Sequence, residues 1–253
     1  MFTAELESLR EQLADLGIET EKQHKQLLDY SNLLYKWNKH FNFVSRLDIE
    51  RLPRRHLLDS LSSVSLLLPG RVLDIGSGGG LPGLVLAIAR PDVSFTLLDR
   101  HSRKVRFLNQ CIQTLGLANV QAVEVDLQPD DPWSQQHQQH FQTILSRAVT
   151  GVQALWTMSL PLLQPGGQLV AYTSTQSSAG SQFGETATDR ESEKTLRELF
   201  AFDPFAKNPQ LRQLHPEKLE ERVEENSGEK LGQTPSQDVH LLLRVALKEL
   251  TAG

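Results

Sequence analysis

The sequence predicts an α/β protein with a mostly parallel sheet flanked by helices and an N-terminal helical extension. From residue 71 onward, apolar runs of strand length alternate with segments of helical periodicity. The first run ends in a turn that holds four glycines within residues 76–80. Strands separated by helices pair in parallel through right-handed crossovers. We therefore expect a doubly wound sheet that binds ligands at the carboxyl ends of its strands.

The composition indicates a reduced, water-soluble protein. With 253 residues, of which 39% are hydrophobic and 23% charged, the chain suits one moderate domain with an appendage. No apolar run approaches the roughly 20 residues of a membrane span, and the N-terminus carries acids where a signal peptide is basic. The single cysteine, Cys111, excludes an internal disulfide and a cysteine-based zinc cluster. We expect a cytoplasmic protein with no metal and no membrane partner, and Cys111 in the core.

The charge is unevenly spread. The net charge is −5, but residues 30–60 hold six Lys/Arg against three acids, and residues 99–110 hold four against one. Residues 181–230 hold twelve acids against eight bases. A basic face built from the first two segments is compatible with RNA, although a solvated helix surface explains the same charges.

The N-terminal part is predicted to be helical over residues 4–16, from Thr20 onward, and over about 49–68. Thr20 and Gln23 have capping-box spacing. The second helix carries a buried apolar stripe. Its members are Leu27, Tyr30, Leu34, Trp37 and Phe41. We expect residues 1–68 to form an extension packed on the core, with Trp37 as a core anchor, and residues 69–253 to form the second part.

The second part is predicted to contain five strands in sequence and a late sixth and seventh. The first five are expected at residues 72–75, 93–98, 120–125, 141–145 and 168–172. Helices are expected at 84–90, at 102–116 with Ser102 as N-cap and Gly116 as the stop, and at 151–163. A polar insertion covers about 174–236 and reads as helical near 217–225, and the last strand is expected at 238–247. A further strand must lie within the polar stretch, at a position that the pattern does not give.

The glycine turn by itself fits two nucleoside ligands. Gly78-x-Gly80-x-x-Gly83 matches the dinucleotide fingerprint, and Gly76-x-Gly78-x-Gly80 matches the turn of S-adenosylmethionine enzymes. A tight turn without a ligand has the same letters. Asp99, at the end of the second strand, is placed to accept hydrogen bonds from ribose hydroxyls, which NAD and S-adenosylmethionine both have.

Other residues favour S-adenosylmethionine. Asp74 lies two residues before the first glycine, where its charge suits a cationic amino-acid end and opposes a pyrophosphate. Asp126-Leu127-Gln128 follows the third strand, where an adenine ring would lie. Arg147 ends the fourth strand, which suggests an anionic or planar ligand, or an ion pair with Asp74 or Asp126.

At this point the motifs resemble a known family. They are Leu34-x-Lys36-Trp37-Asn38-Lys39-x-x-Asn42, Arg55-His56-x-x-Asp59-Ser60, Asp74-x-Gly76-x-Gly78-x-Gly80-Leu81-Pro82-Gly83, Arg90-Pro91, Leu97-Leu98-Asp99, Val105-x-Phe107-Leu108 and Ser146-Arg147-Ala148. Together they resemble the RsmG (GidB) family of bacterial methyltransferases that act on small-subunit ribosomal RNA. The resemblance covers about residues 27–173 and the final strand.

The resemblance implies a Rossmann-like methyltransferase fold and transfer of a methyl group from S-adenosylmethionine to N7 of a guanine in 16S rRNA. It implies Arg147 as the catalytic residue, which orients substrate or cofactor. The implied cofactor contacts are Asp74, Gly76, Gly78, Leu81, Asp99, Asp126, Leu127, Gln128 and Arg147. The expected RNA contacts are Arg55, His56, Arg100, Arg103 and Lys104. The partner would be 16S rRNA or the small ribosomal subunit, and the chain a monomer.

Two departures from the family pattern keep alternatives open. Asp126-Leu127-Gln128 stands where the family has an arginine followed by small and acidic residues, and Tyr172-Thr173-Ser174 replaces a lysine-glycine ending. A catalytically weakened ribosome- or RNA-binding protein is one alternative, and an NAD(P)-dependent oxidoreductase is another. His56 and Asp59 either contact RNA or join the third helix to the sheet.

Overall fold

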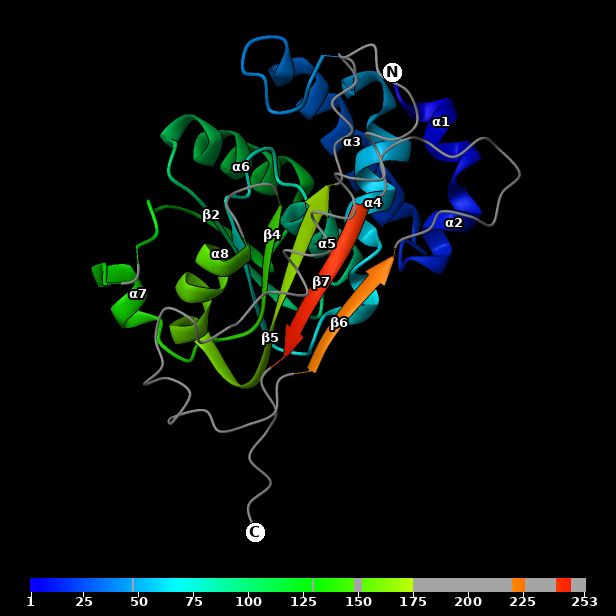
Figure 1. The fold of residues 1–253 in the computed structure, drawn as a ribbon. Helices are drawn as coiled ribbons and strands as arrows, with labels where there is room; N and C mark the ends of the chain where they lie inside the picture. The colour runs from blue at the N-terminus through cyan, green and yellow to red at the C-terminus, as the bar shows by residue number, and fades with distance from the viewer. Residues whose placement is uncertain (47, 129, 148–151, 175–219, 226–239, 247–253) are drawn as a thin grey trace, which may run out of the picture.

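The computed structural model describes residues 1–46, 48–128, 130–147, 152–174, 220–225 and 240–246, which contain one seven-stranded sheet (Figure 1). The strands are β1 (Arg71–Ile75), β2 (Ser94–Asp99), β3 (Val120–Glu124), β4 (Phe141–Arg147), β5 (Leu163–Ser174), β6 (Glu220–Glu225) and β7 (His240–Ala246). Their order is β3-β2-β1-β4-β5-β7-β6, parallel through β5 and antiparallel at β7 and β6. The order reverses at β1, between β2 and β4. In such sheets ligands bind at the carboxyl ends beside that reversal.

The N-terminal helices lie on the side of the sheet that α5 (Gly83–Ala89) and α6 (Ser102–Leu115) cover, where α3 packs on α5 and α6, and α4 packs on α5. They are α1 (Thr3–Ser8), α2 (Arg10–Asp15), α3 (Glu21–Asn38), η1 (Ile49–Arg51), η2 (Pro53–Leu57), α4 (Leu58–Leu61) and η3 (Val64–Leu66). The capping box of α3 is confirmed, because Thr20 accepts from the Gln23 amide and the Gln23 side chain accepts from Thr20. The single helix predicted over 49–68 is wrong: the segment is a 3-10 turn, a π-helical turn, a short α-helix and another 3-10 turn. Pro53 has no N–H to donate in the middle of that run, which breaks the regular ladder.

The remaining helices follow the strands. They are α5 (Gly83–Ala89), α6 (Ser102–Leu115), α7 (Pro132–Gln136), α8 (Val152–Ser159) and η4 (Leu160–Leu162). Gly116 ends α6 in the left-handed conformation with φ 62°, as predicted. Ser102 is the first helical residue rather than the N-cap; His101 holds the cap position and makes no side-chain capping bond.

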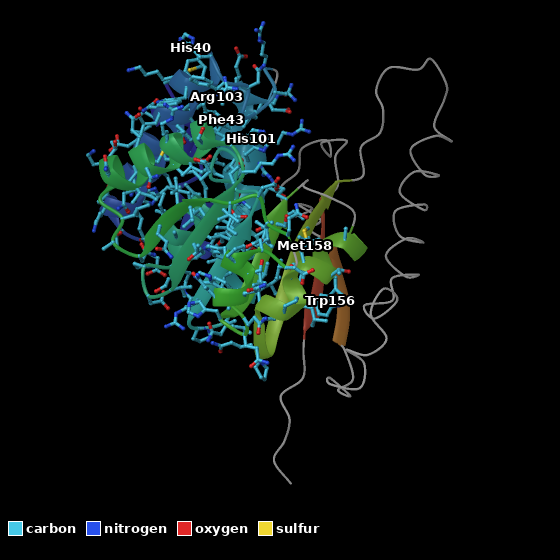
Figure 2. The ribbon with its side chains drawn as sticks, turned by 90° about the vertical axis from the view of Figure 1, so that its left-hand side faces the viewer. His40, Phe43, His101, Arg103, Trp156 and Met158 are labelled. Atoms are coloured by element: carbon cyan, nitrogen blue, oxygen red, sulfur yellow. The ribbon has the colours of Figure 1, made fainter. Side chains whose placement is uncertain are left out.

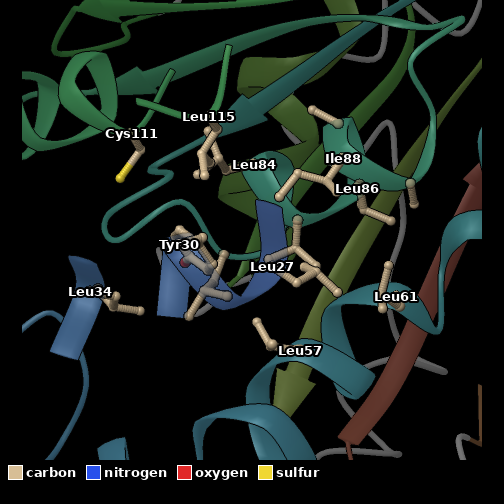
Figure 3. Close-up of a cluster of buried hydrophobic side chains, with 14 of the residues drawn as sticks. Leu27, Tyr30, Leu34, Leu57, Leu61, Leu84, Leu86, Ile88, Cys111 and Leu115 are labelled. Atoms are coloured by element: carbon tan, nitrogen blue, oxygen red, sulfur yellow. The ribbon is translucent and has the colours of Figure 1, made fainter. Parts of the chain in front are cut away.

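Alternate residues of β1 enter two different cores. Leu73 and Ile75 pack with α8, whose Trp156 and Met158 are labelled in Figure 2. Val72 faces the other way, into the cluster formed with α3, α4, α5 and α6. Figure 3 shows this second cluster, where Leu27 lies with Leu57, Leu61, Leu84, Ile88 and the buried Cys111. The period-two alternation of a strand buried on both faces therefore separates the helices into two layers.

Two details of the chain differ from the prediction. Residues 220–225 form the edge strand β6, so the helix expected near 217–225 is wrong there. Glutamate favours helix by itself, but pairing with β7 supplies the backbone hydrogen bonds that decide the conformation. This strand is also the one that the pattern did not locate, while the rest of 174–236 lies outside the described residues. The division of the chain at residues 68 and 69 stays a prediction.

Phe41 is the second difference. The apolar period continues to Phe41, but α3 ends at Asn38, and the Phe41 side chain is 37% exposed. Trp37, still on the helix, is half-buried against Phe107, as expected of a core anchor.

The hydroxyl of Tyr30 links α3 to the glycine turn. Tyr30 is fully buried, and its hydroxyl donates to the Gly79 carbonyl at 2.8 Å. Gly79 is itself buried. This hydrogen bond holds the glycine turn against α3, while Gln23 and Gln26 of the same helix donate to the Ile88 and Leu115 carbonyls of α5 and α6.

We expect Tyr30→Phe to lower the free energy of unfolding by roughly 1–2 kcal/mol, because a buried carbonyl loses its donor. Urea titration followed by circular dichroism measures the change. Tyr35→Phe is the matched control: Tyr35 is half-buried on the same helix, its ring packs on Phe2, and its hydroxyl makes no hydrogen bond to a described residue. Equal effects of the two substitutions would contradict a specific role for the Tyr30 hydroxyl.

Candidate functional site

The glycine turn lies at the carboxyl end of β1 and is built from positive-φ residues. Gly76, Gly78 and Gly80 have φ of 74°, 56° and 90°. At Gly78 an added Cβ would meet only the Gly76 carbonyl, at 3.8 Å, so space is open beside it. A backbone of this kind, with no side chain above it, lets a ligand approach the peptide groups closely.

Asp74 is a buried carboxylate with one oxygen unused. Its Oδ2 accepts a hydrogen bond from the Gly83 amide at 3.0 Å. Its Oδ1 is buried and has no hydrogen-bond partner among the described residues. Burial raises the pKa of Asp74 to about 6, against the nearby Ser77 hydroxyl, the hydrogen bond from Gly83 and the charge of Arg147, which all act to lower it. The Ser77 hydroxyl donates to the Asp74 backbone carbonyl at 3.0 Å and so leaves Oδ1 without a donor. At neutral pH the group is ionised, and its negative charge is incompletely compensated.

Gly83 is required by that contact. A Cβ there would lie 2.5 Å from both Asp74 Oδ2 and Leu97 Cδ2. The glycine that is third in the dinucleotide fingerprint therefore serves close packing of α5 on the sheet, and it contributes no specificity for a dinucleotide.

Asp99 ends β2 as an ionised, hydrogen-bonded carboxylate. Its Oδ2 accepts from the Gly78 amide at 3.0 Å, and its Oδ1 accepts from the His101 amide at 3.0 Å. The Lys104 Nζ lies 3.4 Å away. Burial acts to raise the pKa of Asp99, but the His101 hydrogen bonds, Lys104 and Gly78 together hold it below its usual value. The structure thus brings Asp74, Gly78 and Asp99 together around one turn, as the sequence predicted.

Residues 126–128 follow β3, the strand that pairs with β2. The Val125 amide donates to the Asp99 carbonyl at 3.2 Å, which ties this segment to the end of β2. Leu127 is buried, while Asp126 and Gln128 are exposed. The Gln128 amide donates to Asp131 Oδ2 at 2.8 Å, and Asp131 also caps α7. The Gln128 amide, which lies where an adenine ring was expected, therefore already has an internal partner.

Arg147 ends β4 and pairs with Asp59 of α4. Its Nη1 lies 3.3 Å from Asp59 Oδ2, with side chains that are 19% and 9% exposed. The ion-pair alternatives named from the sequence, Asp74 and Asp126, are not the partners that the structure gives. Asp59 therefore does join the N-terminal extension to the sheet. Next to Arg147 in the β4–β5 register, the Tyr172 hydroxyl donates to the Ser60 carbonyl at 2.9 Å and makes a second link to α4.

His56 lies in η2, 9% exposed, and neither ring nitrogen has a hydrogen-bond partner among the residues described. Burial, with the nearby charge of Arg147, lowers the pKa of His56 to about 4. The ring is therefore neutral at physiological pH. Arg55 beside it pairs with Asp48 at 2.7 Å.

The three other basic residues predicted for RNA gather at the start of α6. Arg100 and Arg103 are exposed, and Lys104 is half-buried against Asp99. The Arg103 guanidinium lies over the ring of Phe41, 5.9 Å from its centroid, beside His40 and Phe43 (Figure 2). Phe41 was wrongly predicted as part of the buried stripe, and the half-buried Phe43 beside it was not singled out from the sequence. Asn38 and Asn42 were the signal in the sequence that the helix ends before Phe41, because asparagine competes with the backbone hydrogen bonds of a helix.

Over the described ranges, no group of three or more His, Cys, Asp or Glu side chains is arranged to hold a metal ion. Nor does any helix in those ranges have the length and apolar character needed to cross a membrane.

Comparison with known proteins decides the family. The family described as "GidB: rRNA small subunit methyltransferase G" matches residues 23–200. The chain belongs to this family. A ribosomal RNA small subunit methyltransferase G of Marinobacter nauticus is 42% identical over 167 residues, covering 64% of this chain and 74% of that one. The protein of the same name from Chromobacterium violaceum is 42% identical over 173 residues, covering 68% and 79%.

Family membership confirms the resemblance seen in the motifs and the predicted class of enzyme, an S-adenosylmethionine-dependent methyltransferase of Rossmann-like fold. Among solved structures, an S-adenosyl-L-methionine-dependent methyltransferase described as putative, from Methanococcus maripaludis, matches with a TM-score of 0.48 and 15% identity. That match covers 88% of this chain and 94% of that one. An rRNA methylase from Streptococcus thermophilus matches with a TM-score of 0.47 and 13% identity, covering 78% and 98%.

We expect Asp74→Asn to remove a pH dependence of stability. A carboxyl whose pKa is raised from 3.8 to about 6 binds more protons in the folded chain than in the unfolded chain between these values. Wild-type stability therefore loses a contribution as pH rises from about 4 to 6, on the order of 2–3 kcal/mol. Relative to wild type, Asp74→Asn should gain that amount between pH 4 and pH 7 in urea unfolding.

The control for this prediction is Asp92→Asn. Arg90 holds the pKa of the exposed Asp92 below its usual value, so its contribution has the opposite sign. A difference between Asp74→Asn and wild type that is constant with pH would contradict the buried-carboxylate interpretation.

Proposed function

We propose that the chain transfers the methyl group of S-adenosylmethionine to N7 of a guanine in 16S rRNA. The observation that carries the proposal is the buried, half-satisfied carboxylate of Asp74 next to the open backbone of Gly78. A ligand with a cationic amino-acid end fits this charge, and a pyrophosphate does not. Family membership supports the RNA as substrate, and the same Asp74 disfavours an NAD(P)-dependent oxidoreductase.

The residues present fit this cofactor. When bound, S-adenosylmethionine supplies the electrophilic methyl group of its sulfonium. Asp74 offers negative charge beside the turn, Gly76 and Gly78 leave the backbone accessible, and ionised Asp99 accepts hydrogen bonds. Leu81, at the entrance to α5, and the segment Asp126-Leu127-Gln128 complete the proposed cofactor contacts.

Methylation of guanine N7 requires no proton transfer by the protein before the attack. N7 carries a free lone pair and no proton, so the chain needs no general base. The protein instead has to orient the base in line with the methyl group and exclude water. Guanine presents O6 and N7 as acceptors, and a donor on N7 itself would block attack. We therefore assign Arg147, held by Asp59, to orientation of the guanine through O6 or of the cofactor.

Neutral His56 lies within the field of Arg147 and offers one donor and one acceptor. Both ring nitrogens are buried, so we propose no direct contact between His56 and the RNA. We propose that Arg100, Arg103 and Lys104 contact phosphates. Arg55 forms an ion pair with Asp48, so this carboxylate competes with a phosphate for it.

The partner and location follow from this substrate. We propose that a monomeric chain meets 16S rRNA, free or within the small subunit, in the cytoplasm. Incubation with labelled S-adenosylmethionine tests the proposal, using unmodified 16S rRNA both naked and assembled in subunits. Label should reach one guanine, identified by mass mapping. Cofactor binding without label in either RNA would refute the active enzyme and favour a weakened RNA-binding protein.

We expect Arg147→Ala to lower the methyl-transfer rate by about 100-fold, because the planar donor that orients the reacting groups is lost. Single-turnover transfer of label measures it. Arg147→Lys should recover part of the rate, since it keeps charge without the fork of donors.

The matched control is Arg71→Ala, which removes an exposed arginine at the amino end of β1, far along the strand from the turn. It should leave the rate unchanged. A wild-type rate in Arg147→Ala, with a cooperative unfolding transition, would remove Arg147 from the mechanism.

A further inference from the structure

The loop after α3 is held in one shape and presents Phe41. The buried side chain of Asn38 donates to the Val44 carbonyl and accepts from the Val44 amide, both at 2.9 Å. The amides of His40 and Phe41 both donate to the Trp37 carbonyl, at 2.9 and 3.1 Å. Both ends of the loop are thus fixed by hydrogen bonds. Phe41 is exposed because the backbone places it there.

Phe41 is the outer member of a continuous set of rings, which we call the aromatic platform: Trp37, Phe41, Phe43 and Phe107. The Trp37 and Phe41 centroids are 5.3 Å apart, and Phe43 stacks on Phe107 at 4.7 Å. Among the described residues, the large hydrophobic side chains that are exposed are Phe41 and Met1. A single exposed ring is ordinary, but a ring that is backed by others and held by a fixed loop is a preformed surface.

The platform adjoins the glycine turn. A Cβ on Gly79 would lie 3.2 Å from the Cβ of Phe43. Tyr30, on the same helix α3 as Trp37 of the platform, donates to the Gly79 carbonyl. A ligand group that stacks on Phe41 would therefore lie near a ligand bound at the glycine turn.

The charge around the platform selects the partner. Residues 36–46 and 100–106 together hold seven Lys/Arg and no Asp or Glu, in a chain with net charge −5. Six of the seven are exposed: Lys36, Lys39, Arg46, Arg100, Arg103 and Arg106. The Arg103 guanidinium lies over Phe41 itself. Figure 2 labels Arg103 near Phe43 and His40. An exposed ring with a guanidinium over it, inside a field of positive charge, matches an unpaired base on a phosphate backbone.

We propose that Phe41 stacks on an unpaired base of the RNA next to the methylated guanine, while Arg103 and the surrounding basic residues contact its phosphates. The inference rests on the proposed function, since it takes RNA as the substrate. A base within a duplex is already stacked on both sides, so the platform selects single-stranded or loop nucleotides. It also ties the RNA close to the turn that holds the cofactor.

Binding of a short fluorescein-labelled oligoribonucleotide to the full chain, followed by anisotropy without cofactor, tests the proposal. Phe41→Ala and Phe41→Leu should both weaken binding of the single strand about tenfold, and Phe41→Trp should retain it, because stacking needs a π-face. The same sequence in a duplex should bind more weakly and show no dependence on residue 41. Wild-type affinity in Phe41→Leu, or equal effects on duplex and single strand, would overturn the proposal.

Salt dependence separates stacking from charge. Arg103→Gln should reduce the slope of log affinity against log salt by roughly 0.7, the value for one phosphate contact to a single strand. Phe41→Ala should leave that slope unchanged. A reduced slope in Phe41→Ala would mean that the substitution disturbs the basic residues, and would count against a stacking role.

Fluorescence gives an independent readout, because Trp37 lies 5.3 Å from Phe41. Bound oligonucleotide should quench tryptophan emission in wild type, and Trp37→Phe should lose the quenching. Binding without quenching would place the base elsewhere. Calorimetric titration with S-adenosylmethionine should give the same affinity for Phe41→Ala and wild type, which shows that the variant is folded.

Methyl transfer distinguishes failure of this inference from failure of the proposed function. If 16S rRNA is methylated and Phe41→Ala leaves the ratio kcat/KM unchanged, the platform is not part of RNA recognition. If single strands bind with dependence on Phe41 but no methyl group is transferred, the platform stands and the proposed reaction fails.

Discussion

The contact between the Asp74 carboxylate and the Gly83 amide is the constraint on which the site depends. It brings the first residue of α5 against β1 so closely that only glycine fits, and it leaves the second oxygen of Asp74 buried with no hydrogen-bond partner among the described residues. Burying an ionised carboxylate costs several kcal/mol unless it is compensated. The fold carries this cost at the point where the glycine turn opens. Unfavourable features of this kind tend to persist where a ligand relieves them, and a cationic group beside the turn would do so.

The N-terminal extension gives the turn its second support and connects it to the surface. Tyr30 binds the Gly79 carbonyl from α3, and Phe43 packs on Gly79 from the loop that follows. Asp59 of α4 holds Arg147 at the end of β4. The helices are therefore part of the site as well as of the core. A change in the position of α3 would move the turn and the aromatic platform together, because both are fixed to the same helix.

Local rules predicted the elements whose signals lie within a few residues: the five parallel strands, the capping box at Thr20, the stop at Gly116 and the glycine turn. They failed where distant contacts decide. The glutamates of β6 have a local preference for helix, but pairing with β7 makes the segment a strand. The apolar period includes Phe41, but Asn38 uses its side chain on Val44 and ends the helix first. The partner of Arg147 is 88 residues away, and only the packing of α4 on the sheet brings it near. Asp99 was predicted because it ends a strand beside the turn, and Asp74 because it lies two residues before the first glycine.

Net charge and local charge lead to opposite expectations for this chain, and the distance over which charge acts decides between them. At physiological ionic strength the screening length is about 8 Å, so an exposed phosphate responds to the residues that it touches and hardly to the total of −5. The segments around the platform contain bases and no acids, and the guanidinium of Arg103 lies over an exposed ring. An RNA strand approaching this edge therefore meets a positive surface whatever the rest of the chain carries. All 31 Asp and Glu residues lie outside these segments, so an RNA strand that approaches elsewhere meets acids locally, which favours binding at this edge.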